Sequence, residues 1–228
     1  MTGFPAPNSN GSTASSEGVK TLVIETATAA CSVALLEGDA VIARGHDVVG
    51  RGHAERLVPM IADLPGQGRA GRILVDVGPG SFTGVRVGLA AARGLSIGWG
   101  VPVFGYSSMA LIAAARFHAD PDLATLAVTL EGGHGEVFMQ AFTSAPFREE
   151  GPLASLAPPA ALAALGDRRA FGSGVQRLAA LDTGLDLHDA LPDAADAALL
   201  PSAFAALPPR PIYGRAPDAR TLAERGLA

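Results

Sequence analysis

The chain has 228 residues, 48% of them hydrophobic and 17% charged, which is enough for one large folded domain or two small ones. Its net charge is −5, and its 17 Lys and Arg residues are scattered, which disfavours direct binding of RNA or DNA. A single cysteine, Cys31, excludes an intramolecular disulfide and a cysteine-cluster metal site, and its apolar surroundings favour a core position over a nucleophile.

Residues 1–19 are rich in Pro, Asn, Ser and Gly and cannot bury apolar surface, so we expect a disordered tail. The tail lacks the basic start and apolar run of a signal peptide, and no later stretch has the pattern of a membrane span. We therefore expect a cytoplasmic protein without membrane contact.

The following residues, 20–118, alternate strands and helices in the order β-β-β-α-β-α-β-α. The expected elements are strands at 21–27, 31–36 and 40–44, a helix at 52–64, a strand at 73–77, a helix at 84–98, a strand at 101–104 and a helix at 108–118. Three sequential antiparallel strands followed by α/β alternation are typical of a ribonuclease-H-like subdomain.

A second cycle begins near Ala124 and predicts a shortened subdomain of the same kind over 119–228. Its expected elements are strands at 125–130 and 136–142 joined as a hairpin, a helix at 159–165, a strand at 169–172 and a helix at 175–181. The internal repeat is weak at the level of sequence.

The most informative stretch is Gly78-Pro79-Gly80-Ser81-Phe82-Thr83-Gly84, between a buried strand and a helix. Its three glycines allow positive φ and close approach, Pro79 fixes one turn dihedral, and either Ser81 or Thr83 can cap the helix. Such turns often bind phosphate, but this spacing fits neither the Walker A loop nor Gly-x-Gly-x-x-Gly. The loop is either an anion site of another kind or a close-packing device.

These residues resemble the TsaB (YeaZ) family. The Gly-Pro-Gly-Ser-Phe-Thr-Gly-Val-Arg string at 78–86 is the most specific match. The stretches 24–35, 51–61 and 101–108 match closely, while 135–138 and 211–215 match more loosely. The resemblance implies an actin-like ATPase (ASKHA) superfold, an α/β fold of two ribonuclease-H-like subdomains with mixed sheets and flanking helices.

The resemblance also implies a non-catalytic dimerisation subunit in the complex that transfers a threonylcarbamoyl group to N6 of adenosine 37 in ANN-decoding tRNAs. The implied partners are a TsaD-like catalytic subunit and a TsaE-like ATPase, with tRNA bound only through the complex. ATP and metal are expected on those partners, and no cofactor is expected on this chain. A homodimer remains open for the chain alone.

The sequence departs from the family pattern at several positions. Glu25 stands where Asp is usual, and it is the one candidate for cofactor binding, as part of a remnant nucleotide site. The alternative is a strand-end carboxylate that is hydrogen-bonded to the 26–28 turn, and we favour this alternative. Ser108 and Ile112 stand where the catalytic relative has a His-x-x-x-His metal pair, and isoleucine cannot ligate a metal. The role of the Glu131–His134 turn stays open.

A partner interface is predicted on two helices. In helix 84–98 the small residues Gly84, Gly88 and Ala91 and the larger Leu95 recur on one stripe, which allows another helix to approach closely. Burial of this stripe within the fold is the alternative. In helix 52–64, Glu55 and Met60 are the expected contacts. Leu95→Asp should then abolish pairing and leave a folded monomer.

Three rival functions are alternatives to this one. An M22-type glycopeptidase needs metal ligands that Ser108 and Ile112 do not supply. An ATP-binding ASKHA enzyme, such as a sugar or acetate kinase, needs a second phosphate loop and a catalytic Asp, and neither is evident. The negative net charge disfavours a stand-alone tRNA-binding module.

Overall fold

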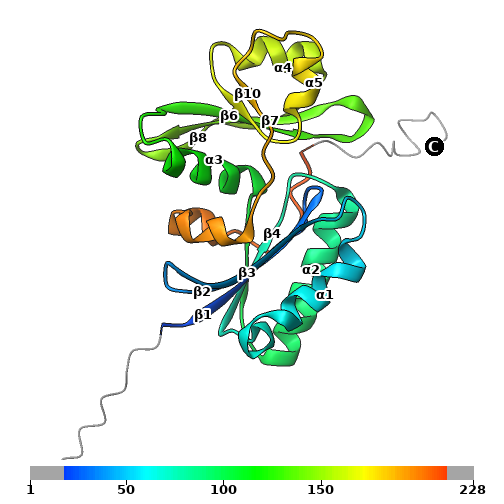
Figure 1. The fold of residues 1–228 in the computed structure, drawn as a ribbon, viewed down its shortest axis with the longest axis vertical. Helices are drawn as coiled ribbons and strands as arrows, with labels where there is room; N and C mark the ends of the chain where they lie inside the picture. Colours follow the sequence, from blue (N-terminus) through cyan, green and yellow to red (C-terminus); the bar gives the residue numbers. More distant parts are fainter. Residues whose placement is uncertain (1–17, 215–228) are drawn as a thin grey trace, which may run out of the picture.

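The computed structural model describes residues 18–214, which form two α/β subdomains stacked along the long axis of the molecule (Figure 1). The predicted tail at 1–19 lies, apart from residues 18 and 19, outside the described residues. The elements of the first subdomain are β1 (Lys20–Glu25), β2 (Ala30–Glu37), β3 (Ala40–Val48), α1 (His53–Asp63), η1 (Pro65–Gly68), β4 (Arg72–Asp76), α2 (Phe82–Trp99), β5 (Val103–Tyr106) and α3 (Ser108–Ala119).

The second subdomain repeats the same succession of strands and helices, with shorter elements after its first three strands. Its elements are β6 (Thr125–Glu131), η2 (Gly133–Gly135), β7 (Val137–Ser144), β8 (Phe147–Leu156), α4 (Pro158–Leu165), β9 (Ala170–Phe171), α5 (Val175–Ala179) and β10 (Leu187–His188). Two further short helices follow, η3 (Ala194–Leu199) and η4 (Ser202–Ala205).

The two sheets have the same topology. The first has the strand order β3-β2-β1-β4-β5 and the second β8-β7-β6-β9-β10. In each, three strands pair antiparallel in succession, and the remaining two continue the sheet in parallel. The weak repeat in sequence is thus a clear repeat in structure, and the predicted superfold of two ribonuclease-H-like subdomains is confirmed.

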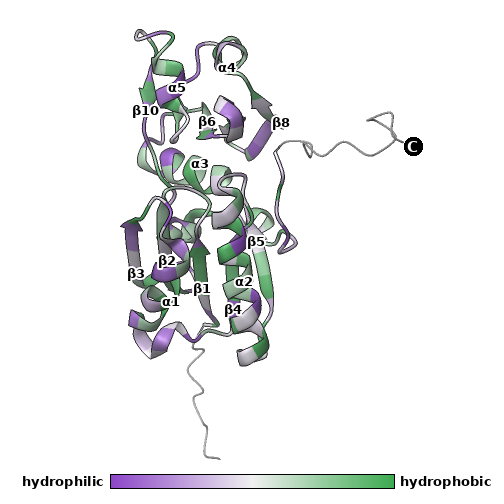
Figure 2. Cartoon of the chain, turned by 90° about the vertical axis from the view of Figure 1, so that its right-hand side faces the viewer, coloured by the Kyte–Doolittle hydropathy of each residue, from purple (hydrophilic) through white to green (hydrophobic). Residues whose placement is uncertain are grey.

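Alternating side chains give the first sheet two buried faces. Leu22 and Ile24 of β1 join the core formed with α1 and α2. Val23 points to the opposite face, where it packs with Leu74 and with residues of α3 and η3. The period of two along each strand therefore covers both faces with helices. Figure 2 shows the resulting hydrophobic colouring of β1 and the more hydrophilic edge strand β3.

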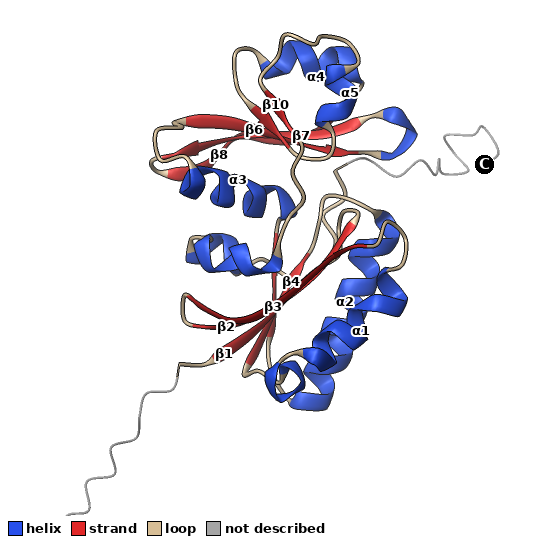
Figure 3. Cartoon of the chain, in the orientation of Figure 1, coloured by secondary structure: helices blue, strands red, loops and turns tan. Residues whose placement is uncertain are grey.

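Helix α3 lies between the two sheets (Figure 3). Met109 and Ile112 pack into the core of the second sheet, whereas Leu111 packs against the first. A helix covered on both sides must be apolar around most of its circumference, and the run Met109–Ala114 is fully apolar and buried. In residues 18–214 no helix has the length and apolar character required to cross a bilayer.

The chain returns to the first subdomain after β10, and we call residues 193–213 the return segment. Ala194, Ala195 and Ala197 of η3 pack on the first sheet. Further on, Leu207 and Gly105 exchange two backbone hydrogen bonds of 2.7 and 3.0 Å. The predicted second subdomain over 119–228 therefore includes residues that pack on the first, because small alanine side chains fill the sheet face beside α3.

Candidate functional site

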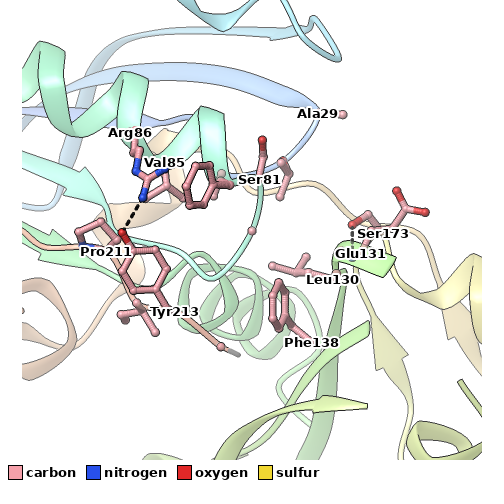
Figure 4. A pocket seen from close by; sticks show the side chains of 18 of the residues that line it. Ala29, Ser81, Val85, Arg86, Leu130, Glu131, Phe138, Ser173, Pro211 and Tyr213 are labelled. Carbon is pink, nitrogen blue, oxygen red and sulfur yellow. Dashed lines mark hydrogen bonds between the residues drawn. The ribbon is translucent and has the colours of Figure 1, made fainter. Parts of the chain in front are cut away.

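A cleft of about 920 Å³ opens between the two subdomains (Figure 4). One wall is the turn after β1, the glycine loop and the start of α2; the other is the end of β6 with the Gly132–His134 turn and Ser173. The end of the return segment closes one side, with Pro211 and Tyr213 among the lining residues. Most of the lining comes from connections between the regular elements and from the helix and strand ends beside them, where binding functions concentrate.

The glycine loop is pressed onto the turn after β1. A Cβ at Gly80 would clash with the backbone carbonyl of Ala27, and the Ser81 N–H donates to that same carbonyl oxygen at 2.6 Å. Gly78 adopts φ +94°, which favours glycine. Of the two readings left open by the sequence, these contacts support close packing.

Ser81 is the residue that caps α2. Its hydroxyl oxygen accepts a hydrogen bond from the Gly84 N–H at 3.2 Å, and Thr83 lies exposed within the first turn. We expect Ser81→Ala to lower the free energy of unfolding by about 1 kcal/mol. Thr83→Ala should change it by less than about 0.5 kcal/mol. Denaturant unfolding of the two variants decides the matter, and equal effects would contradict the assignment of the cap.

Aromatic rings and a guanidinium group gather at the mouth of the cleft. Arg86 lies 3.2 Å from the ring centroid of Phe82, and its Nη2 donates to the Tyr213 hydroxyl at 3.0 Å. The Phe82 and Tyr213 rings are 6.5 Å apart. The arginine therefore links the return segment to α2, since it stacks on Phe82 of α2 and donates a hydrogen bond to Tyr213 of the return segment.

Glu25 does not line the cleft. Its side chain is fully buried at the end of β1, where Oε1 accepts from the Ala27 N–H at 2.9 Å and Oε2 accepts from the Tyr106 hydroxyl at 3.0 Å. Burial raises the pKa of Glu25 to about 7. This geometry is that of a strand-end carboxylate bonded to its own turn, the reading favoured from the sequence.

The positions that match the relative's metal pair are interior. Ser108 donates its hydroxyl to the Pro79 carbonyl at 2.9 Å, and Ile112 belongs to the core of the second sheet. Among residues 18–214, no group of three His, Cys, Asp or Glu side chains is placed to hold a metal ion. Burial also raises the pKa of the Cys31 thiol to about 11, which suppresses the nucleophilic thiolate.

Three of the predicted interface residues are corrected by the structure. A Cβ at Gly84 would clash with the Thr26 carbonyl, and one at Gly88 with the Thr26 hydroxyl, so both glycines face the chain's own β1. Met60 is 3% exposed and belongs to the first core. The small-residue stripe thus allows α2 to approach its own sheet, which leaves it unavailable to a partner.

Ala91 and Leu95 are half-buried at the edge of the first core, and Glu55 is exposed. The side of α1 and α2 that points away from the sheet carries another set of residues, which we call the outer helix face. It consists of Glu55, Val58, Ala62, Ala90, Gly94, Ile97 and Gly98. Sequence reasoning missed most of these residues, although Ala90, Gly94 and Ile97 also recur at helical spacing.

The outer helix face is apolar for an exposed surface. Ile97 is 85% exposed and Val58 is 62% exposed. The glycines at 94 and 98 have no atom within 4 Å of a Cβ built on them, so the surface around them is open. A surface of this kind on two adjacent helices is typical of a site where other helices dock.

Comparisons with known proteins agree with the fold and the sequence motifs. The family model described as TsaD, tRNA N6-adenosine threonylcarbamoyltransferase, matches residues 47–150. The chain is 35% identical over 127 residues to the tRNA threonylcarbamoyladenosine biosynthesis protein TsaB of Escherichia coli, an alignment that covers 53% of each protein. It is 40% identical over 106 residues to TsaB of Haemophilus influenzae, covering 42% of each.

Among solved structures, the chain is similar to a Pseudomonas aeruginosa protein described as uncharacterized with similarity to peptidase YEAZ. The TM-score is 0.71 at 28% identity, covering 86% of this chain and 99% of that one. The sequence alignments reach less far: in them the chain spans about half the length of the curated relatives it matches. The likeness in fold therefore extends beyond the likeness in sequence.

Proposed function

We propose that the chain, which is similar in sequence and fold to TsaB (YeaZ) proteins, acts in threonylcarbamoyladenosine biosynthesis as a non-catalytic dimerisation subunit. Its task in this proposal is to bind a TsaD-like subunit, which transfers the threonylcarbamoyl group to N6 of adenosine 37 in ANN-decoding tRNAs. The observation that carries the proposal is the outer helix face of α1 and α2.

The outer helix face supports pairing through helices because its residues suit close helix–helix contact. Its alanines and glycines allow another backbone to approach, and Ile97 with Val58 supply the apolar area whose burial would stabilise a complex. Each of these two side chains contributes roughly 1–2 kcal/mol of hydrophobic stabilisation when a partner removes it from water.

The chemistry of the proposed partner follows from the family model. That model describes the transferase and matches residues 47–150, a stretch that contains α1 and α2. A TsaD-like protein thus has counterparts of the same two helices. Two similar helix pairs related by a pseudo-twofold axis form a four-helix bundle, an arrangement that buries the apolar faces of both pairs.

The interior of the chain supports a role without catalysis. Ser108 and Ile112 are buried and are not metal ligands as a pair, which also weighs against the alternative of an M22-type glycopeptidase. The glycine loop is packed against Ala27 rather than open to an anion, which weighs against the alternative of an ATP-binding enzyme. In the proposal ATP and metal belong to the TsaD-like subunit and a TsaE-like ATPase, and tRNA binds through the complex.

Reconstitution tests the proposal. The TsaD-like and TsaE-like proteins from the same cell are combined with tRNA, a threonylcarbamoyl donor and ATP, with and without this chain, and modified adenosine is measured by mass spectrometry. We expect modification only when the chain is present, and none from the chain alone. Undiminished transfer without it would overturn the proposal, and activity of the chain alone would overturn its non-catalytic part.

A further inference from the structure

Three titratable side chains form a buried row across the first sheet, on the face that carries α3 and η3. In the parallel register Ile24 pairs with Val75, so that Glu25 and Asp76 follow at neighbouring positions, and Asp76 pairs with Tyr106. All three members of the row are 0% exposed. The proposed function assigns no role to this row.

The row holds three separate segments of the chain through backbone N–H groups. Asp76 Oδ1 accepts from the N–H of Gly78 at 2.9 Å, in the glycine loop, and from that of Ser108 at 3.0 Å, at the start of α3. Glu25 accepts from Ala27, in the turn that lines the cleft. The carboxyl pair therefore anchors two loops of the cleft and the helix between the subdomains.

One atom of the row is unsatisfied. Asp76 Oδ2 is buried and has no hydrogen-bond partner among the described residues. A buried carboxylate oxygen without a donor is costly, whereas a protonated carboxyl oxygen is neutral and can itself donate. The unpaired Oδ2 atom of Asp76 can therefore carry one proton.

Burial opposes ionisation of both carboxyl groups, and the groups around them act in both directions: the Tyr106 hydroxyl, which donates to Glu25, favours the ionised form of Glu25, whereas the charge of Asp193 opposes it. The charged or titratable groups that act on the pair are Tyr106 of β5, Asp193 before η3 and, through its ion pair with Asp193, Arg44 of β3. Arg44 is largely exposed and lies 3.5 Å from Asp193. From α3 and the two loops the pair receives backbone N–H groups: those of Gly78, Ser108 and Val77 act on Asp76 and that of Ala27 on Glu25. Burial, followed for Asp76 by the charge of Glu25, raises the pKa of both carboxyl groups.

We propose that Glu25 and Asp76 hold one proton between them near neutral pH, and that this shared proton keeps the two anchored loops of the cleft and the start of α3 in place. The two groups titrate as a unit. A proton is the smallest occupant that removes one of two adjacent buried negative charges. When it leaves at higher pH, repulsion between the carboxylates loosens the anchored segments.

The sign of the pH effect follows from the direction of the shifts. When folding raises the pKa of a carboxyl group, the group makes its most favourable contribution to stability at low pH, where it is protonated in both the folded and the unfolded protein. This stabilisation is complete below the ordinary pKa of Glu, 4.5, and is lost as pH rises through about 7 for Glu25. The fold therefore weakens between mildly acidic and mildly alkaline pH because of this pair.

Thermal unfolding from pH 5 to pH 9 provides the first test, on the wild type, Glu25→Gln, Asp76→Asn and the exposed control Glu149→Gln. The two row variants carry one fewer charge and should melt about 5–10 °C above the wild type at pH 8.5. The difference should vanish near pH 5. The control should follow the wild type at every pH. Parallel curves for all four proteins would overturn the proposal.

Infrared spectroscopy tests the shared proton directly and does not depend on the variants folding. The wild type should show the carbonyl band of a protonated carboxyl group at pH 7 that disappears on titration to pH 10; its absence at pH 7 would overturn the proposal. The band should be lost in Glu25→Gln and in Asp76→Asn, and persistence in either would assign the proton to a single residue. If added K⁺ or Mg²⁺ raises the melting temperature of the wild type at pH 8.5 but not that of either variant, the proposal is overturned. A bound cation, and not a proton, then neutralises the pair.

Discussion

Gly84→Ala should lower the free energy of unfolding by about 3 kcal/mol or more. The added methyl group would meet the backbone carbonyl of Thr26, and the Thr26 hydroxyl already donates to the Gly84 carbonyl at 2.8 Å. Neither group is the flexible end of a long side chain, so α2 must move away from β1 to make room. Denaturant unfolding of the isolated chain measures the change.

Gly94→Ala is the matched control, because it makes the same substitution in the same helix. Gly94 is exposed, with no atom within 4 Å of a Cβ built on it. Alanine should there stabilise the chain by about 0.5–1 kcal/mol through its higher helix propensity. A Gly84→Ala variant as stable as the wild type would show that the small-residue stripe is not required for packing on β1.

Ile97→Asp should weaken binding of the TsaD-like partner by about 100-fold or more. The substitution places a charge on the outer helix face, where pairing would remove it from water without a counter-charge. The isolated chain should keep its stability within about 0.5 kcal/mol, since Ile97 is 85% exposed. Calorimetry or analytical ultracentrifugation of the mixed proteins gives the affinity.

Leu181→Asp is the control for this variant, because Leu181 is a half-exposed apolar residue on the second subdomain, away from α1 and α2. It should bind the partner normally. Leu95→Asp, the substitution suggested by the sequence, is less decisive because Leu95 also packs against the first core. Normal binding by Ile97→Asp would place the interface elsewhere on the chain.

Most of the fold could be predicted because its signals are local. Apolar runs bounded by glycine and proline gave the central strands, and the glycine loop correctly placed the start of α2. The strand β8 was missed, because Glu149, Glu150 and Pro152 are typical of a loop. It forms as an edge strand, where one side of the backbone needs no partner and charged residues are tolerated.

The site was harder to predict, since it depends on relations between distant residues. Two stripes of small residues run along α2, and no local signal shows that Gly84 and Gly88 face the sheet while Gly94 and Ile97 face outward. The buried row of Glu25, Asp76 and Tyr106 also depends on relations between distant residues. Asp76 comes beside Glu25 and Tyr106 only through the register of three strands, and that register is set by packing of the whole sheet.

The return segment also constrains the order in which the chain can fold. The first sheet is complete only when η3 covers one of its faces and Leu207 closes the edge strand β5, and both come from the last quarter of the sequence. During synthesis the first subdomain emerges early, but the part of its apolar face that α3 does not cover stays exposed until these residues are made. The two subdomains, although each repeats the same topology, therefore mature together as one cooperative unit.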